Sequence, residues 1–328
     1  MPYRVFAFVL RSRKWDGYRR MIVSLVSQHF RNRDSSSGRR EQVDIVKGKG
    51  KGLILLLHGA PGVGKTSTTE GVAEHFKKPL FQITCGDLGT TAKEVEMTLE
   101  TNFALTSRWG CILLLDEADL FLAVRTKHDF IRNGLVAAFL RVMEYYTGIL
   151  FLTTNRVGDF DEAFKSRIHI SLYYRELTQP KTIDVFALNM DIIEERFRSN
   201  GKSIEIDKVA IGSFASEHFA NYPHARWNGR QIRNACQTAL ALAEFEVIEE
   251  RNDSVIKLTI DHFKTVQKAY LDFAKYIQDL FGTNSARRAK EDKLRAIVLD
   301  ELENDQIVFM DRRQAFKAAA QAQAQPTT

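Results

Sequence analysis

Short apolar runs alternate with amphipathic stretches through the first half of the chain. Helical spacing of apolar residues predicts helices over 65–76, 91–106 and 130–146, and a short one over 161–165. Apolar strands separated by helices are typical of a parallel sheet with both faces covered, so the pattern predicts an α/β domain with five core strands. The runs with the length of buried strands are residues 53–58, 80–84, 111–116, 149–153 and 168–173.

The strand pattern stops after Gln179-Pro180, and the segments that follow have helical spacing. This change predicts a separate all-helical unit of roughly 100 residues, which is an ordinary domain size. Its helices are expected at residues 180–199, 207–220, 228–250 and 259–281.

Polar and glycine-rich stretches divide the chain into parts. Residues 34–40 and 47–52 have the composition of flexible linkers, and helical spacing covers residues 18–30 before them. The chain ends in Ala/Gln repeats typical of a tail that is helical at best. We therefore expect a basic N-terminal segment with linker (1–42), an α/β domain (43–178), a helical domain (179–283) and a helical or low-complexity tail (284–328).

The composition is that of a globular protein. Hydrophobic residues make up 44% of the chain and the net charge is +6, which excludes a chain disordered throughout. Three scattered cysteines, Cys85, Cys111 and Cys236, form no disulfide framework and indicate a reducing intracellular compartment. The cytoplasm is the first expectation, with nucleus and mitochondrion left open. No run approaches the roughly 18 apolar residues that span a bilayer, so we expect no transmembrane segment.

The positive charge is concentrated near the start of the chain. Residues 1–50 carry 12 Lys and Arg against 4 Asp and Glu, whereas the remainder carries 35 against 37. A basic arm of this kind can contact nucleic acid or an acidic membrane surface, although a solvated lead-in is the commoner role. Contact with nucleic acid is therefore expected through residues 1–50 or not at all.

One glycine-rich segment matches G-x-x-x-x-G-K-[ST] in full. An apolar strand precedes it and a helix follows, which is the context in which glycines let backbone N–H groups wrap a phosphate chain. Lys65 would reach the outer phosphates, and the hydroxyl of Thr66 would bind Mg²⁺. The predicted phosphate-binding residues are Gly59, Ala60, Pro61, Gly62, Val63, Gly64, Lys65, Thr66 and Ser67.

A second apolar strand ends in two adjacent carboxylates, Asp116 and Glu117. Ligands of open α/β sheets bind at the carboxyl ends of the strands, so both acids are expected beside the phosphate loop. Asp116 would hold the magnesium ion through water, and Glu117 would act as general base on the attacking water. Residues 116–119 read Asp-Glu-Ala-Asp, as in helicases, but a helical unit follows where a helicase would have a second sheet domain.

Three more polar residues lie where they can contact a nucleotide. Asn155 closes the fourth strand, Arg167 is expected at the start of the fifth, and Arg230 opens a helix of the second unit. An asparagine there can orient a water, and an arginine can reach phosphate. A turn residue and surface ion pairs are the alternative readings.

The order of these parts resembles the AAA+ ATPases, most closely a group of fungal AAA-family ATPases. The likeness covers residues 43–281 and includes "KGLILLLHGAPGVGKTS", "FQITCGDLGTTA", "WGCILLLDEADLFL", "FLTTNRVGDFDEAFKSRIHISL" and "NGRQIRNACQTALALA". It makes Gly59–Thr66 a Walker A motif, Ile112–Glu117 a Walker B motif and Asn155 a sensor-1 residue. The opening "PYRVFAFVLRSRKW" is similar to the end of an additional N-terminal domain, which implies a shortened member or a trimmed gene model.

The resemblance implies binding of ATP with Mg²⁺, a helical lid and assembly into a ring, usually a hexamer. Arg167 would reach the neighbouring subunit's γ-phosphate, and Arg230, next to a glycine and therefore preferred over Arg233, would sense it from the lid. Hydrolysis would drive remodelling of a macromolecular client. Adenine specificity is also implied by the resemblance, because a phosphate loop does not contact the base.

Two alternatives to a remodelling ATPase stay open. Residues 85–92 have no aromatic, unlike the pore loops of many AAA unfoldases, and Arg167 has no Pro-Gly-spaced partner arginine. The missing aromatic and the shortened N-terminus favour a nucleotide-gated assembly module that binds ATP and hydrolyses it negligibly, whereas the intact set of Asp116, Glu117 and Asn155 argues against it. The single arginine instead implies a simpler interface or another finger residue. A small-molecule kinase would share the phosphate loop, but it has no need of Asp116, Glu117, Asn155 and a helical lid together.

Overall fold

The structure is a computed structural model. It describes residues 16–34, 52–125, 129–249 and 255–282, together with a few residues between 288 and 294. Most of the expected tail (284–328), most of the two linkers and the first fifteen residues lie outside the described residues, so what the sequence indicates for them stays a prediction.

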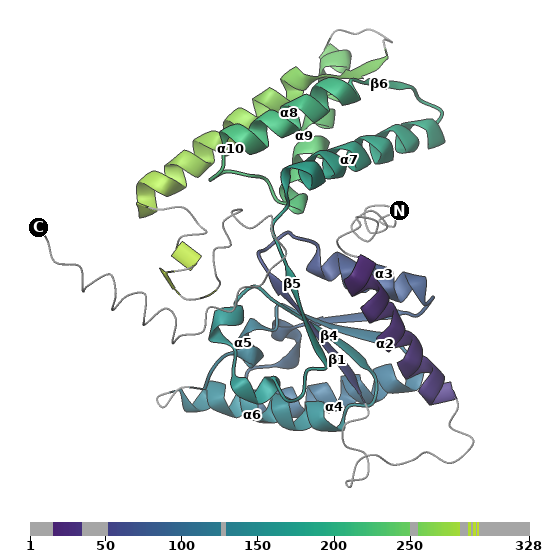
Figure 1. Cartoon of the computed structure of the whole chain (residues 1–328), viewed down its shortest axis with the longest axis vertical. Coiled ribbons are helices and arrows are strands. Elements are labelled where there is room, and N and C mark those ends of the chain that lie inside the picture. Colours follow the sequence, from purple (N-terminus) through teal and green to yellow (C-terminus); the bar gives the residue numbers. More distant parts are fainter. Residues whose placement is uncertain are drawn as a thin grey trace, which may run out of the picture. The chain divides into compact units, whose positions relative to one another are not determined.

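The first domain is built on a five-stranded parallel sheet, as the sequence predicts (Figure 1). The strand order is β2-β3-β4-β1-β5, so strands distant in sequence are neighbours. Parallel pairing brings the carboxyl ends of all five strands to one edge. The strands are β1 (Leu53–Gly59), β2 (Leu80–Thr84), β3 (Ile112–Asp116), β4 (Ile149–Thr154) and β5 (Ile170–Tyr174).

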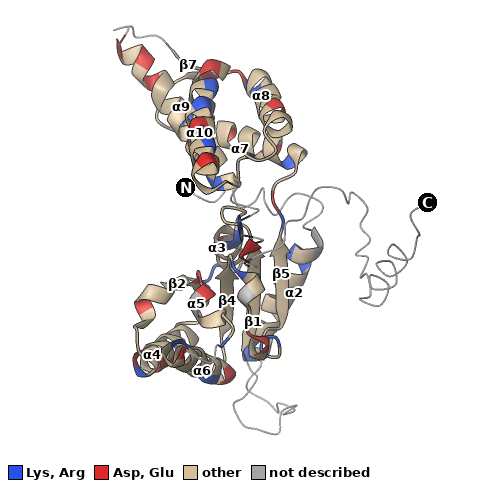
Figure 2. Cartoon of the chain, turned by 90° about the vertical axis from the view of Figure 1, so that its left-hand side faces the viewer, with Lys and Arg blue, Asp and Glu red and all other residues tan. Residues whose placement is uncertain are grey.

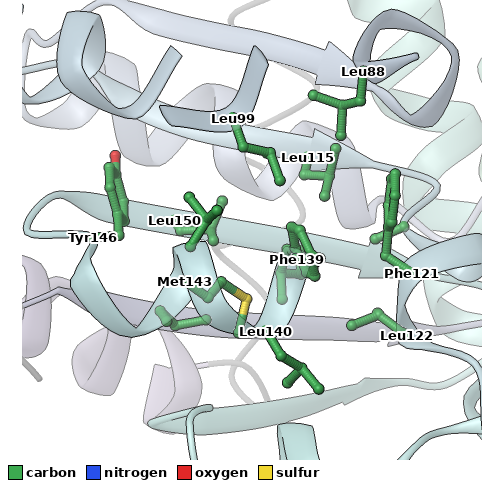
Figure 3. Packing of buried hydrophobic residues seen from close by; sticks show 14 of the residues in the cluster. Leu88, Leu99, Leu115, Phe121, Leu122, Phe139, Leu140, Met143, Tyr146 and Leu150 are labelled. Carbon is green, nitrogen blue, oxygen red and sulfur yellow. The ribbon is translucent and has the colours of Figure 1, made fainter. Parts of the chain in front are cut away.

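Helices cover both faces of this sheet, because its central strands are apolar on both sides. α2 (Asp16–Asp34) and α3 (Lys65–His75) pack on the face that carries Leu55 and Leu114. α4 (Ala92–Trp109), α5 (Asp119–Leu122) and α6 (Phe130–Tyr145) pack on the other face. Figure 3 shows this second core, in which Phe121, Phe139 and Leu115 are fully buried.

Short 3-10 helices occupy the loops of the sheet: η2 (Cys85–Leu88), η3 (Val157–Asp159) and η4 (Glu162–Phe164). η4 replaces the short helix expected at 161–165. Asp161 caps it by accepting a hydrogen bond from the N–H of Ala163 at 2.8 Å.

The helix expected at 18–30 forms as the longer α2 and belongs to the core of the α/β domain. Ile22 and Val26 lie one helical turn apart and are 1% and 0% exposed. They join the cluster that contains Leu55 and Val72. A solvated lead-in therefore does not describe residues 16–34.

The second domain contains the four predicted helices, α7 (Gln179–Ser199), α8 (Lys208–Asn221), α9 (Gly229–Glu249) and α10 (Ile260–Phe281). Phe186, Phe214, Trp227 and Phe263 form its core. The expectation of an all-helical unit is wrong in one detail, because β6 (Ile204–Ile206) pairs with β7 (Ile256–Leu258). Three-residue strands are too short to show a period in the sequence.

Charges of both signs are interspersed on the helices of the second domain (Figure 2). On α10, for example, Lys264 lies 3.5 Å from Asp261, and Lys268, Asp272, Lys275 and Asp279 follow in turn. Much of the basic segment 1–50 lies outside the described residues, so contact with nucleic acid stays a prediction. Among the helices that the structure describes, none is long and apolar enough to cross a membrane.

Candidate functional site

The glycine-rich loop joins β1 to α3 along a path that glycine alone follows easily. Gly64 caps α3 with a φ of 94° and offers no side chain to the first turn of the helix. A Cβ on Gly59 would lie 2.2 Å from the carbonyl oxygen of Tyr174 on β5. The loop therefore needs glycine both for conformation and for space. Ala60, Pro61, Gly62 and Val63 complete it, and Ser67 lies in the first turn of α3.

Lys65 is the buried cation of this loop, with an exposed fraction of 7%. Its Nζ donates hydrogen bonds to the carbonyl oxygens of Gly59, at 3.1 Å, and Ala60, at 2.7 Å. It also donates to Oδ1 of Asn155 at 2.7 Å. Lys65 follows β1 and Asn155 follows β4, so two predicted site residues that are distant in the sequence lie in contact.

Thr66 and Asp116 bring oxygen ligands together at the same edge. The hydroxyl of Thr66 lies 3.2 Å from each carboxylate oxygen of Asp116, and Gln82 Nε2 donates to Oδ2 of Asp116 at 3.3 Å. A hydroxyl and a carboxylate suit Mg²⁺, which prefers oxygen ligands and keeps several waters. Among the described residues there is no cluster of three or more His, Cys, Asp or Glu that would hold a metal by itself. The ion would therefore take its other ligands from phosphate and water.

Glu117 adopts a left-handed backbone conformation, with a φ of 53°. For a residue with a side chain this costs of order 1–3 kcal/mol. The backbone is held on both sides. The N–H of Glu117 donates to Oγ1 of Thr153 at 3.0 Å, and the thiol of Cys85 donates to the carbonyl oxygen of Glu117 at 3.0 Å. The sequence alone does not indicate Thr153 or Cys85 as residues of the site, since both contacts depend on strand order.

Asn155 follows the last residue of β4, and a second acid supports it. Oδ1 of Asp119, the first residue of α5, accepts a hydrogen bond from the N–H of Asn155 at 3.1 Å and another from the hydroxyl of Thr154. Asp119 is the last acid of the Asp-Glu-Ala-Asp run. In this structure it supports the strand end that carries Asn155, a role that the sequence did not indicate.

Arg167 lies three residues before β5 and not at its start, because the strand begins at Ile170. Its guanidinium donates to the carbonyl oxygen of Ala163 at 2.7 Å and forms an ion pair with Glu144 of α6. These contacts are within its own subunit. The structure does not bring Arg167 to the phosphate loop.

Arg230 is the second residue of α9 and is exposed, as is Arg233. A reciprocal cap fixes this end of the helix. The N–H of Asn228 donates to Gln231 Oε1, and the N–H of Gln231 donates to Asn228 Oδ1, both at 2.9 Å. Arg230 is thereby anchored at a defined helix start.

His58 precedes the loop and stacks on Tyr173, with ring centroids 5.3 Å apart. Burial lowers the pKa of His58, and the neighbouring charge of Lys65 lowers it further. The side chain at the base of the loop is therefore neutral near pH 7, which leaves the positive charge of Lys65 as the local attraction for phosphate.

Two family models match consecutive parts of this chain. Residues 55–176 match the family of ATPases associated with various cellular activities (AAA), and residues 178–284 match the fungal AAA+ ATPase lid domain. The chain belongs to the AAA family of ATPases. The change of model at residue 177 falls between β5 and α7, so the AAA domain is the α/β domain and the lid is the helical one.

Several curated proteins are similar to part of this chain. Human ATPase family AAA domain-containing protein 3B is 33% identical over 134 residues, which are 38% of this chain and 21% of that protein. The Drosophila melanogaster 3A homolog is 34% identical over 126 residues, 37% of this chain and 21% of that protein. The rat 3A protein is 31% identical over 167 residues, 48% of this chain and 27% of its own length. The chain thus matches about a fifth to a quarter of these relatives.

Proposed function

We propose that this AAA protein binds Mg·ATP and hydrolyses it. The observation that carries the proposal is the convergence of Lys65, Asn155, Thr66 and Asp116 at one sheet edge, with Glu117 following directly. Thr66 and Asp116 would hold Mg²⁺, which neutralises phosphate charge when bound. Lys65 binds and orients the outer phosphates.

Glu117 and Asn155 act on the water. Glu117 accepts a proton from the attacking water at its carboxylate, and the amide of Asn155 orients that water between the base and the phosphate. A phosphate-binding module alone has no need of this pair. The contact of Asn155 with the Walker A lysine, and the position of Glu117 directly after the aspartate that Thr66 contacts, support hydrolysis over simple binding.

Assembly and coupling extend the proposal. The protein forms a ring, and Arg167 leaves Glu144 to reach the γ-phosphate held by a neighbouring subunit, a contribution of about 10³–10⁵ in rate where an arginine acts in this way. Arg230 acts from the lid and couples the state of the nucleotide to movement of the lid. The work done on a macromolecular client is remodelling.

A nucleotide-gated assembly module is the second candidate, and the segment after β2 favours it. Oδ2 of Asp87 accepts bonds from the N–H and the hydroxyl of Thr84, both at 2.7 Å, and Glu94 accepts from the N–H of Thr91 at 3.1 Å. These caps fold residues 85–92 into η2 and the start of α4. The segment carries no aromatic to grip a threaded polypeptide.

Phosphate release and size-exclusion chromatography together separate the two candidates. We expect wild-type specific activity to rise with protein concentration and Glu117→Gln to bind ATP while losing about 10²–10⁴-fold in turnover. Glu100→Gln, an exposed site on α4, is the matched control and should be unaffected. Assembly on ATP without phosphate release would favour the module, and near wild-type turnover of Glu117→Gln would remove Glu117 as the base.

A further inference from the structure

Thr153 lies at the junction of the two Walker B acids and is 2% exposed. The parallel pairing of β3 and β4 ends at Leu115 and Leu152, so the next residues, Asp116 and Thr153, are cross-strand neighbours on the same face. This is the face on which α3 packs, and α3 carries Thr66.

The hydroxyl of Thr153 makes two different hydrogen bonds. It donates to Oδ1 of Asp116 and accepts from the N–H of Glu117 at 3.0 Å. The assignment of the protons is unambiguous, because an N–H can only donate and an ionised carboxylate can only accept. In addition, the N–H of Ala118 donates to the carbonyl oxygen of Thr153 at 2.9 Å. One residue of β4 therefore contacts three successive residues, Asp116, Glu117 and Ala118, at the end of β3.

We propose that Thr153 is a positioning residue for both Walker B acids, which rests on the proposed ATPase function. Through Asp116 it fixes the direction of the carboxylate toward Thr66. Through the N–H of Glu117 it holds the left-handed backbone turn that aims the base. Thr153 is a positioning residue and not a catalytic one, because the single proton of its hydroxyl is donated to Asp116 and the residue acts through Asp116 and Glu117.

The two contacts predict a specific pattern of kinetic change. Removing the hydroxyl takes one hydrogen bond from the Asp116 carboxylate, which keeps those from Thr66 and Gln82, and leaves the N–H of Glu117 without this acceptor. The affinity for ATP depends on Lys65 and the loop backbone, which Thr153 does not contact in the described structure. Loss of the hydroxyl should therefore lower kcat and raise the Mg²⁺ concentration needed for half-maximal rate, while the affinity for ATP stays nearly unchanged.

The test compares Thr153→Val, which keeps the shape and removes the hydroxyl, with Thr153→Ser, which keeps the hydroxyl. We expect Thr153→Val to lose roughly 10–100-fold in kcat and to need more Mg²⁺ for half-maximal rate, as partners of metal ligands do. Binding of a fluorescent ATP analogue should stay within about threefold, and Thr153→Ser should keep most of the wild-type kcat.

Thr69→Val is the matched control. Thr69 is also a fully buried threonine of this domain, but its Oγ1 has no hydrogen-bond partner among the described residues. Thermal unfolding of every variant separates loss of fold from loss of function. Thr153→Ala, which removes the hydroxyl without adding a branched methyl, gives a second measurement should Thr153→Val fail to fold.

The outcomes distinguish the two levels of the proposal. Wild-type kcat and Mg²⁺ dependence in folded Thr153→Val or Thr153→Ala would overturn the role of Thr153 and leave the ATPase proposal standing. An equal loss in Thr153→Ser would also overturn it, because the hydroxyl would then not be the cause. Wild-type protein with no phosphate release dependent on Glu117 would overturn the ATPase proposal and this one with it.

Discussion

The ammonium of Lys65 donates a 2.7 Å hydrogen bond to Oδ1 of Asn155, a residue 90 positions later in the chain. Strands β1 and β4 are neighbours in the sheet, so the loop after β1 and the residue after β4 meet at the same edge. The contact joins the residue that would bind phosphate to the residue that would orient water. The contact places both residues at one site, which neither motif indicates alone.

Replacement of Lys65 should abolish tight nucleotide binding. Lys65→Ala removes the buried cation of the loop, and the loss of charged hydrogen bonds to phosphate predicts a fall in ATP affinity on the order of 100-fold. Titration with a fluorescent ATP analogue measures this directly. Lys93→Ala, an exposed lysine on α4, controls for charge and should bind as wild type does. Comparable affinity in Lys65→Ala would mean that the loop is not the nucleotide site.

The role of Arg167 between subunits predicts complementation. Arg167→Ala and Glu117→Gln should each be inactive alone. For Arg167→Ala we expect the rate of ATP hydrolysis to fall by about 10³–10⁵-fold. Mixed at equal concentration, they should regain activity at interfaces that pair an intact Glu117 with an intact Arg167. Phosphate release across a range of mixing ratios measures the recovery. If activity did not recover at any ratio, Arg167 would not act on the neighbouring subunit, and its role would be the ion pair with Glu144.

The packing of α2 predicts that the α/β domain needs residues 16–34 for stability. Ile22→Ala should lower the free energy of unfolding by about 2–5 kcal/mol, because it opens a cavity in the core shared with Leu55 and Val72. Met21→Ala, at a neighbouring position that is 39% exposed, should cost much less. Urea unfolding monitored by circular dichroism compares the two. If both substitutions changed the free energy of unfolding by the same small amount, the packing of α2 on this core would not contribute to stability.

The burial of His218 predicts that the folded protein loses stability in mild acid. Burial lowers the pKa of its ring from the usual 6.5, and the hydrogen bond to the carbonyl oxygen of Ala225 acts in the opposite direction. Nδ1 lies 2.8 Å from Nε2 of Gln267, which donates to the neutral ring. Because the pKa is lower in the folded protein, the unfolded chain binds more protons below about pH 6.5, and stability falls as the pH drops through this range.

Urea unfolding at pH 7.5 and 5.5, monitored by the fluorescence of tryptophan, tests this expectation. The ring of His218 lies 4.4 Å from that of Trp227, which is one of the three tryptophans of the chain. His218→Gln should reduce the difference between the two pH values, and the exposed His224→Gln should preserve it. An unchanged difference in His218→Gln would assign the acid sensitivity to other groups.

Much of the fold was predictable because its signals are local. Five apolar runs and the helical spacing between them gave the α/β sheet, and the structure confirms it. β6 and β7 were missed because each has three residues, and their pairing joins Glu205 to Lys257 across some fifty positions. The burial of Ile22 and Val26 was missed because their partners lie beyond a linker.

By itself, the sequence determined the phosphate loop, the acids that end β3 and the alternation of strands and helices. Each depends on residues within a few positions of one another, where backbone conformation and periodicity act. The tertiary structure decided which side chains meet: Lys65 with Asn155, Thr153 with Asp116 and Glu117, and Arg167 with Glu144. These contacts depend on the order and register of strands, which are set by packing across the whole sheet and not by any local run of residues.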